Sequence, residues 1–181
     1  MFSQKMMEAL EFSSFAHKDQ QRKGAQIPYI SHPFGVALLL QQAGYGENVI
    51  IAGILHDIVE DTEYTSEDIA LKFGSEIAIL VAGVTEDKTI ISPTERHQKY
   101  LDTIKNSSAE VNAISAADML YNRLSTIKDL KNGVNIYEIL KTNKEEYLKI
   151  GYKRLAIIKE KVNNSLISDL EEVFEEIKSF V

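Results

Sequence analysis

Residues 54–62 read Ile-Leu-His-Asp-Ile-Val-Glu-Asp-Thr and place four ionisable side chains in an otherwise apolar stretch. Residues 49–52 are also apolar, so no polar stripe of ordinary width remains and we expect a helix that is buried on most sides. A buried charge needs a partner, and a divalent cation can supply one, because His and Asp are common metal ligands. The segment therefore predicts a metal site. The alternative is a core histidine with a satisfied hydrogen bond, followed by acidic residues that only end the helix.

The composition narrows the class of protein. With 181 residues, 44% of them hydrophobic, the chain is long enough for one compact domain with a substantial core. It contains no Cys, which excludes disulfides, thiol nucleophiles and Cys-ligated zinc and favours the cytoplasm. The net charge of −7 and the absence of any long apolar run argue against nucleic-acid and membrane partners. A small anionic substrate stays open, and it requires a local basic patch.

Apolar residues recur at helical spacing throughout, without a period-two strand, so the expected fold class is all-α. Two Ser-x-x-Glu patterns, at 92–95 and 107–110, indicate helix starts. The longer connections, 18–31 and 86–91, are candidate active-site loops. The last two helices are expected either to cover the core or to form a homodimer surface. The expected helices are 3–17, 32–43, 47–60, 66–73, 75–84, 93–105, 108–130, 143–161 and 165–180.

Two further metal ligands are predicted from other helices. His32 precedes Pro33 and leads an apolar helix, so it begins a buried element. Asp118 follows Val111 and Ile114 by seven and four residues, which places its carboxylate in line with core-facing side chains. Each signal is weak alone. Together with the central segment, they give a set of two imidazoles and two carboxylates.

The set His32, His56, Asp57 and Asp118 provides nitrogen and oxygen ligands for one divalent cation, with room for water. Such a mixed set suits Mn²⁺ or Fe²⁺ better than a closed zinc site. Adjacent residues diverge by about 100° around an α-helix, so His56 and Asp57 are expected to straddle the direction to the metal.

Glu60 and Asp61 lie one turn beyond the His-Asp pair, on the same faces of the helix. Carboxylates there could orient and deprotonate a water made acidic by the cation, and a nearby acid could protonate the leaving group. Asn122 shares a helix face with Asp118 and could bond a phosphate, a sugar or a base. Arg22 and Lys23 are the best candidates for a basic patch. The structural alternatives are bonds to helix-end water or Thr62 for the two carboxylates, a bond to a neighbouring backbone carbonyl for Asn122, and a solvated loop for the basic pair.

These residues together make the chain resemble the HD-domain phosphohydrolases, and among them the hydrolase domain of the RelA/SpoT alarmone enzymes and the small metazoan SpoT homologue. The resemblance covers about residues 8–130 and implies a single HD-type helical bundle over residues 1–181, with residues 143–181 as a C-terminal helical cover. Its marks are Ala16-His17, Gln21-Arg22-Lys23, Pro28-Tyr29-Ile30-Ser31-His32-Pro33, the segment from His56 to Thr62, Phe73-Gly74, Gly83-Val84-Thr85 and Ala117-Asp118-Met119-Leu120-Tyr121-Asn122.

The resemblance implies a function and assigns roles. Residues matching His32, His56, Asp57 and Asp118 hold one Mn²⁺ in that family. Those matching Glu60 and Asp61 serve the attacking water, and those matching Arg22, Lys23 and Asn122 face the nucleotide. The implied reaction is removal of the 3′-pyrophosphate from guanosine tetra- or pentaphosphate, (p)ppGpp, the alarmone of the stringent response.

The chain departs from the family pattern next to the last ligand. Relatives commonly carry Lys-Leu-Ala-Asp there, whereas this chain has Ser115-Ala116-Ala117-Asp118, so a cation for the phosphate is missing. We expect Lys88 or Arg123 to compensate. Two alternatives follow: a phosphatase acting on another nucleotide, such as a nucleoside monophosphate or NADPH, and a metal-stabilised module that binds a nucleotide without turning it over.

Overall fold

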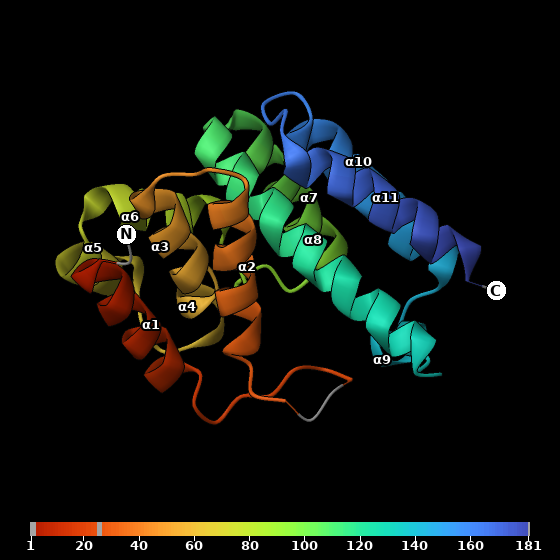
Figure 1. Cartoon of the computed structure of the whole chain (residues 1–181), viewed down its shortest axis with the longest axis horizontal. Helices are drawn as coiled ribbons and strands as arrows, with labels where there is room; N and C mark the ends of the chain where they lie inside the picture. Colours follow the sequence, from red (N-terminus) through yellow and green to blue (C-terminus); the bar gives the residue numbers. More distant parts are fainter. Residues whose placement is uncertain (1–2, 25–26, 181) are drawn as a thin grey trace.

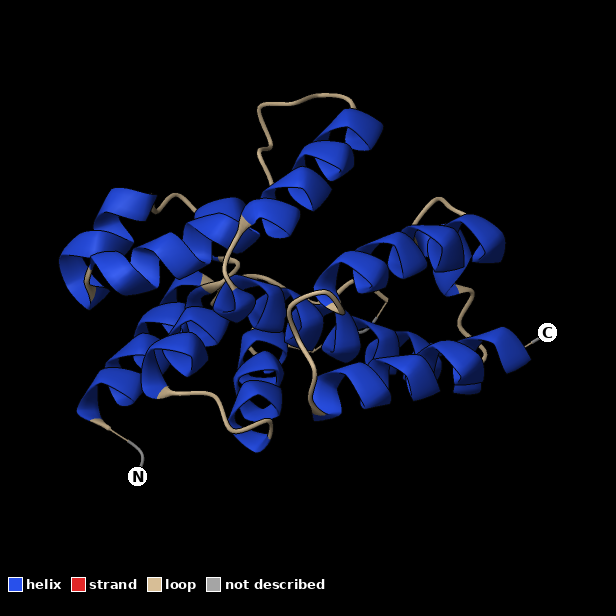
Figure 2. Cartoon of the chain, turned by 90° about the horizontal axis from the view of Figure 1, so that it is seen from above, coloured by secondary structure: helices blue, strands red, loops and turns tan. Residues whose placement is uncertain are grey.

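The structure, a computed structural model, describes residues 3–24 and 27–180. These residues contain no strand, only one isolated antiparallel bridge between Gln21 and Pro28, so the expected all-α class is confirmed (Figure 2). Of the expected 18–31 loop, residues 25 and 26 lie outside the described residues. The helices are α1 (Gln4–Ala16), α2 (Ser31–Gln42), α3 (Glu47–Leu55), α4 (Ile58–Asp61), α5 (Ser66–Phe73), α6 (Ser75–Val84), α7 (Pro93–Asn106), α8 (Ala109–Lys131), α9 (Ile136–Ile139), α10 (Lys144–Ile158) and α11 (Ser165–Ser179).

Helix α8 is the central helix of the fold and packs against helices on both of its sides. On one side it packs against α2, which in turn packs against α3, and α1, α5 and α6 complete that half (Figure 1). On the other side α11 runs along α8, and α10 packs against both α7 and α8. Because α8 belongs to both halves, its buried residues join them into one hydrophobic core. A side chain at the middle of α8 therefore faces the ends of several helices.

The C-terminal helices are buried within the chain on their apolar faces. In α11, Leu170, Phe174 and Ile177 have no exposed surface. In α10, Tyr147, Leu155 and Ile158 are also buried, with at most 9% of each residue exposed. These faces contribute to the core of this chain, whereas a homodimer surface stays a prediction. None of the described helices is both long and apolar enough to cross a membrane.

The helix starts follow capping chemistry. Ser92 accepts a hydrogen bond from the backbone N–H of Glu95, and Pro93 occupies the first helical position of α7, as the sequence predicts. The start of α8 differs by one residue, because Ser108 rather than Ser107 is the cap and accepts from Val111 N. The short α9 was not predicted, since four residues are too few to show a periodic pattern.

The helix expected over 47–60 is wrong in one respect: it breaks at His56 and Asp57 into α3 and α4. The imidazole Nδ1 of His56 donates to Gly53 O at 2.9 Å. In a continuous helix that carbonyl accepts the N–H of Asp57, so the side chain competes with the backbone ladder. At this turn both residues line the same cavity.

Gly35 of α2 marks the closest approach of α2 to α8. A Cβ built at this position would lie 1.9 Å from Cε2 and 2.3 Å from Cδ2 of Tyr121. The Tyr121 ring cannot move freely, because it packs against the imidazole of His32 with the ring centroids 5.1 Å apart. The contact between α2 and α8 therefore requires glycine here.

We predict that Gly35→Ala destabilises the protein by about 1–3 kcal/mol, because overpacking outweighs the better helix propensity of Ala. Gly46→Ala is the control, since nothing lies within 4 Å of its Cβ position. It is expected to lose less than about 1 kcal/mol, because Gly46 is the N-cap of α3, where Ala is less favourable than Gly. Urea unfolding followed by circular dichroism measures both, and equal stabilities of the two variants would contradict the assignment.

Candidate metal centre

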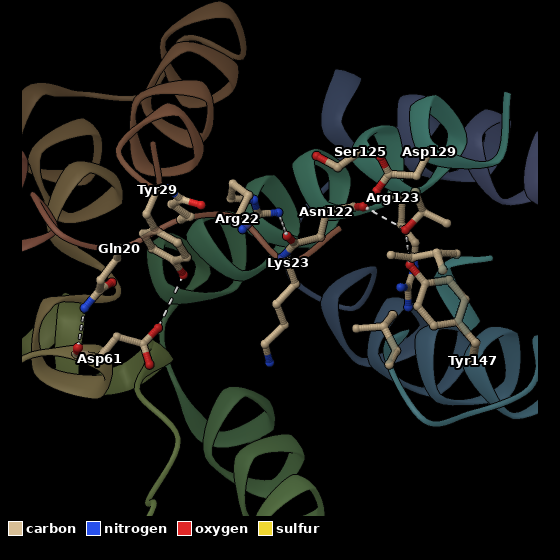
Figure 3. A pocket seen from close by; sticks show the side chains of 14 residues that line it. Gln20, Arg22, Lys23, Tyr29, Asp61, Asn122, Arg123, Ser125, Asp129 and Tyr147 are labelled. Atoms are coloured by element: carbon tan, nitrogen blue, oxygen red, sulfur yellow. Dashed lines mark hydrogen bonds between the residues drawn. The ribbon is translucent and has the colours of Figure 1, made fainter. Parts of the chain in front are cut away.

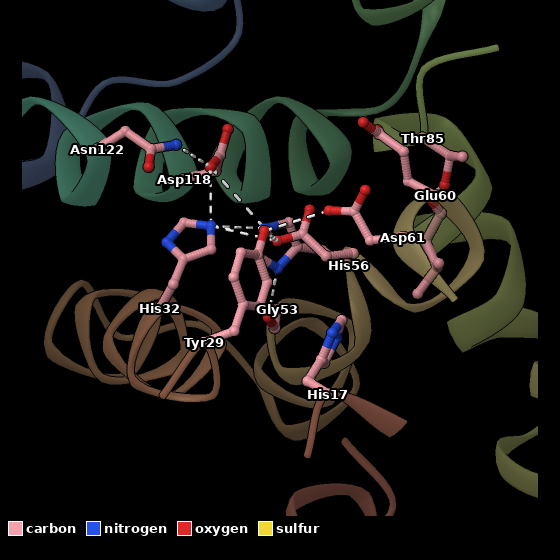
Figure 4. Close-up of polar contacts among 12 residues, drawn as sticks. His17, Tyr29, His32, Gly53, His56, Glu60, Asp61, Thr85, Asp118 and Asn122 are labelled. Atoms are coloured by element: carbon pink, nitrogen blue, oxygen red, sulfur yellow. Dashed lines mark hydrogen bonds and ion pairs between the residues drawn. The ribbon is translucent and has the colours of Figure 1, made fainter. Parts of the chain in front are cut away.

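Three parts of the fold bring the four predicted ligands together. His32 lies at the start of α2, His56 and Asp57 lie at the break between α3 and α4, and Asp118 lies at the middle of α8 (Figure 4). The Nε2 atoms of His32 and His56 are 3.1 Å apart. Asp57 Oδ2 lies 3.3 Å from His32 Nε2 and 3.1 Å from His56 Nε2. Asp118 Oδ1 lies 3.3 Å and 3.8 Å from the same two nitrogens.

These separations fit ligands around one divalent ion. For bonds of about 2.1 Å, neighbouring ligand atoms are about 3.0 Å apart in an octahedron and about 3.4 Å apart in a tetrahedron. One ligand atom from each of His32, His56 and Asp118 lies within 4.8 Å of the other two. Asp57 falls outside that group, yet its Oδ2 contacts both imidazoles, so we include it as the fourth ligand candidate. The donor set therefore suits a divalent metal with mixed nitrogen and oxygen ligands.

The two imidazoles are oriented differently. His56 donates its Nδ1–H to Gly53 O, and this leaves the Nε2 lone pair facing the cavity, as a metal ligand requires. His32 Nδ1 has no hydrogen-bond partner among the described residues, although the side chain is buried. Its ring is held by packing against Tyr29 and Tyr121, with centroid distances of 5.8 Å and 5.1 Å.

Each predicted carboxylate ligand is also held by hydrogen-bond donors in the cavity wall. Tyr29 donates its hydroxyl to Asp57 Oδ2 at 2.6 Å. Asn122 donates to Asp118 Oδ1 at 2.6 Å, and Arg154 donates to Asp118 Oδ2 at 2.8 Å. These donors fix the orientation of the carboxylates, which is the usual function of residues behind a metal ligand.

The electrostatics keep both carboxylates ionised. Burial alone would raise the pKa of Asp118, but Arg154 and His32 outweigh it and hold that pKa well below its ordinary value. The pKa of Asp57 is also well below its ordinary value, because His56 and His32 outweigh burial. For His56, burial lowers the pKa, but the Asp57 and Asp118 carboxylates raise it to about 9. Without a metal, the proton on His56 offsets part of the carboxylate charge, and a bound cation must replace that positive charge.

Glu60 and Asp61 lie beside the ligand cluster, as their spacing predicts. Glu60 accepts a hydrogen bond from Glu86 N at 2.9 Å, and its side chain is 21% exposed. Burial and the nearby Asp57 raise the pKa of Glu60 to about 7, despite the opposing hydrogen bond from Glu86. Lys88 pairs with Asp61 and lies 3.6 Å from Glu60. A carboxyl group that titrates near neutrality is suited to exchange protons with a substrate or with water.

The cluster lies in a cavity of about 210 Å³ that adjoins a second cavity of about 590 Å³. Arg22 and Asn122 line both, and Arg22 donates to Asn122 Oδ1 at 2.7 Å (Figure 3). Lys23 lines only the larger one. At the far end of the larger cavity, the guanidinium of Arg123 lies over the Tyr147 ring, 3.6 Å from its centroid. The arrangement offers a metal pocket next to a larger pocket with a basic wall.

The sequence lacks a cation just before Asp118, but the structure places one beside Asp118 from another helix. Neither expected substitute is placed there: Lys88 pairs with Glu60 and Asp61, and Arg123 stacks on Tyr147. Arg154 of α10 is the arginine that pairs with Asp118. The sequence does carry a signal for it, because Arg154 lies one turn from buried Gly151 on the apolar face of α10.

Tyr29 is a second residue of the site whose individual role we did not predict from the sequence. Its hydroxyl lies within 2.6 Å of Asp57 and 3.3 Å of Asp61, so it joins a predicted ligand to a predicted catalytic carboxylate. Burial and Asp57 raise its pKa above the ordinary value, which keeps the hydroxyl protonated as a donor. The loop that carries it is anchored at His17, which bonds Gln20, and Gln20 in turn donates to Asp61 O.

Comparison with known proteins identifies the family. The model of the HD domain family matches residues 9–145, which include the four ligand candidates and both acidic residues beside them. The chain belongs to the HD domain family. The HD domain of this chain thus includes α2, α3, α4 and α8, whereas most of α10 and all of α11 follow the matched segment.

Among curated relatives, the HD domain is 39% identical over 120 residues to a mouse protein named guanosine-3′,5′-bis(diphosphate) 3′-pyrophosphohydrolase MESH1. The alignment covers 65% of this chain and 66% of the mouse protein, slightly less than two thirds of the relative. A protein of the same enzyme name from Aquifex aeolicus is 37% identical over 128 residues, which are 71% of this chain and 18% of that much longer protein.

Solved structures extend the likeness beyond the aligned sequence. One is described as a metazoan ortholog of SpoT that hydrolyses ppGpp and plays a role in starvation responses. It matches with a TM-score of 0.82 and 29% identity over 99% of this chain and 98% of that chain. The Listeria monocytogenes protein lmo0812 matches with a TM-score of 0.69 and 34% identity, over 83% of this chain and 94% of that one. The helices after the HD domain match therefore have counterparts in the first of these structures.

We predict that Glu60→Gln stabilises the metal-free protein at pH 8 but not at pH 5. A carboxyl whose pKa rises from 4.5 to about 7 on folding contributes stability at low pH, and this contribution is lost as the pH passes the folded value. Gln stays neutral and retains the acceptor for Glu86 N, so the gain at pH 8 should be about 2 kcal/mol. Urea unfolding in the presence of a chelator measures it, and an equal effect at both pH values would contradict the raised pKa.

Proposed function

We propose that this HD domain is a metal-dependent phosphohydrolase that removes the 3′-pyrophosphate from guanosine tetra- or pentaphosphate. The observation that carries the proposal is the convergence of two imidazoles and two carboxylates beside a cavity with a basic wall. The names of the relatives support this choice of substrate. The reaction consumes one water and yields GDP or GTP plus pyrophosphate.

His32, His56, Asp57 and Asp118 would hold the cation. We assign Mn²⁺ to this site, with Fe²⁺ as the alternative, because the mixed set of imidazole and carboxylate ligands favours these ions over a closed zinc site. When bound, the ion lowers the pKa of water and offsets negative charge on the phosphate. The remaining chemistry belongs to side chains of this chain.

Glu60 and Asp61 are assigned to the attacking water. Glu60 has a pKa near neutrality and lies in the wall of the metal cavity, so it can accept a proton from water as the nucleophile attacks phosphorus. Asp61 is within reach of the Tyr29 hydroxyl and of Lys88, which orient its carboxylate. The proton taken up can then pass to the leaving 3′ oxygen, so that no covalent intermediate is needed.

Arg22, Lys23 and Asn122 are assigned to the nucleotide. Arg22 and Asn122 line both cavities, so they can contact a phosphate while the nucleoside occupies the 590 Å³ cavity. The Arg22 guanidinium lies over the rings of Tyr29 and Tyr121, at 5.6 Å and 5.8 Å from their centroids, which limits its motion.

We propose that residues 1–181 act as one domain. We also propose that the protein works in the cytoplasm, where nucleotides and reducing conditions are found.

We predict that the purified protein with Mn²⁺ releases pyrophosphate and GDP from guanosine tetraphosphate, and that Glu60→Gln abolishes this release. The reason is that Gln cannot accept the proton from water. Ion chromatography of the products measures the outcome. Phosphate release from a nucleoside monophosphate or NADPH instead would favour a phosphatase, and bound but unchanged nucleotide would favour a binding module.

The controls separate metal binding from proton transfer. His56→Ala should lose Mn²⁺ and activity together, because it removes a ligand. Glu60→Gln should keep Mn²⁺ at nearly the affinity of the unmodified protein, as measured by titration of free Mn²⁺ with electron paramagnetic resonance. Equal loss of Mn²⁺ in both variants would overturn the division of roles between the two residues.

A further inference from the structure

Arg154 brings a positive charge into the metal cavity from α10, beyond the segment that matches the HD domain family. Its Nε donates to Ser115 Oγ at 2.9 Å. Its Nη2 donates to Ser115 O at 2.7 Å and to Asp118 Oδ2 at 2.8 Å. The guanidinium thus bonds to Ser115 and Asp118, which lie one turn apart on the inner face of α8.

The guanidinium is rigidly held. Tyr100 of α7 lies beneath it, with the ring centroid 5.0 Å away, and the Tyr100 hydroxyl lies 3.0 Å from Ser115 Oγ. Ser115 has no exposed surface, and the Arg154 side chain is 15% exposed. Contacts from two helices fix the orientation before any ligand arrives, which reduces the entropy lost on binding.

The contacts to Ser115 and Asp118 use Nε and Nη2. Among the described residues Nη1 has no hydrogen-bond partner, so its two N–H groups are available to another acceptor, and Arg154 forms part of the cavity wall. A guanidinium with a free edge matches the oxygens of a phosphate, and its charge persists at any physiological pH.

The charge of the cavity shows why an anion needs this residue. Five carboxylates line the 210 Å³ cavity, and an anionic substrate must overcome their repulsion. The arginines in the same wall are Arg22 and Arg154, which lie on either side of Asp118 in a chain of hydrogen bonds through Asn122. The carboxylates are those of Asp57, Glu60, Asp61, Glu86 and Asp118.

We propose that Arg154 is a substrate-binding residue whose guanidinium binds a phosphoryl oxygen, beside the position where α8 carries Ser115 and no cation. In this arrangement a helix that follows the matched family segment supplies the phosphate contact, while Nη2 keeps Asp118 oriented. The proposal rests on the proposed function, because it requires a phosphorylated substrate.

The test measures binding of guanosine tetraphosphate in the Glu60→Gln background, where turnover is blocked. Equilibrium dialysis with saturating Mn²⁺ compares this background with the same protein carrying Arg154→Met or Lys153→Met. Lys153 is the matched control, because it is the exposed neighbour on α10 and its loss changes the net charge equally. Arg154→Met should weaken binding about 10- to 100-fold, the loss of one charge-assisted contact. Lys153→Met should change it less than about twofold.

Two further measurements separate substrate binding from a purely structural role. Mn²⁺ affinity should change less than tetraphosphate affinity in Arg154→Met, because losing a nearby positive charge and losing the bond to Asp118 affect the ion in opposite directions. Adding Ser115→Lys to Arg154→Met should restore at least part of the tetraphosphate binding, since an ammonium from α8 then enters the vacated space.

Arg154→Lys keeps the charge and is the substitute if the Met variant does not fold. Arg154→Lys should lose less tetraphosphate affinity than the loss expected from removing the charge, and it should retain Mn²⁺ binding.

The proposal is overturned if tetraphosphate binding in Arg154→Met is unchanged, falls no more than Mn²⁺ binding does, or is not improved by Ser115→Lys. It is likewise overturned if Arg154→Lys, used as the substitute, loses Mn²⁺ and tetraphosphate binding to the same extent. In those cases binding by the Glu60→Gln background leaves the proposed function standing. If that background binds Mn²⁺ but no tetraphosphate, the proposed substrate is wrong, and the role of Arg154 toward it is rejected as well.

Discussion

The placement of two buried imidazoles against two partly buried carboxylates is the constraint on which the rest of this structure depends. His32, His56, Asp57 and Asp118 come from three separate parts of the chain, and their polar atoms meet within 3.1–3.8 Å. Such a group is stable only if its charges balance, by protons in the metal-free protein or by a cation when one is bound. The packing of α2, α3 and α8 is what holds these charges together.

A layer of hydrogen-bond donors surrounds this group and connects it to the larger cavity, where we propose that the nucleoside binds. Tyr29 holds Asp57, whereas Asn122 and Arg154 hold the two oxygens of Asp118. Arg22 extends the chain of bonds into the larger cavity. The loop before α2 and the helix α10 thereby control the orientation of ligands that lie on other elements.

The sequence predicted most of the helices because their signals are local. Apolar spacing and a capping Ser at position 92 depend only on neighbours along the chain. The ligand candidates could be found because ionisable residues in apolar helices are unusual. The break at His56 and Asp57 could not, since it depends on the bond from an imidazole to the Gly53 carbonyl. The position of Arg154 depends on how α10 packs against α8, and a helical pattern does not specify its partner.

The central claim is that one divalent ion binds between two imidazoles and two carboxylates. Pulsed electron paramagnetic resonance of the protein loaded with one equivalent of Mn²⁺ tests it most directly, because coupling to ¹⁴N reports the nitrogen ligands. We predict one Mn²⁺ per chain with two coupled imidazole nitrogens, and one nitrogen in any His32→Ala or His56→Ala sample that still retains the ion. A bound Mn²⁺ without nitrogen coupling, or no Mn²⁺ bound at neutral pH, would contradict this account of the site.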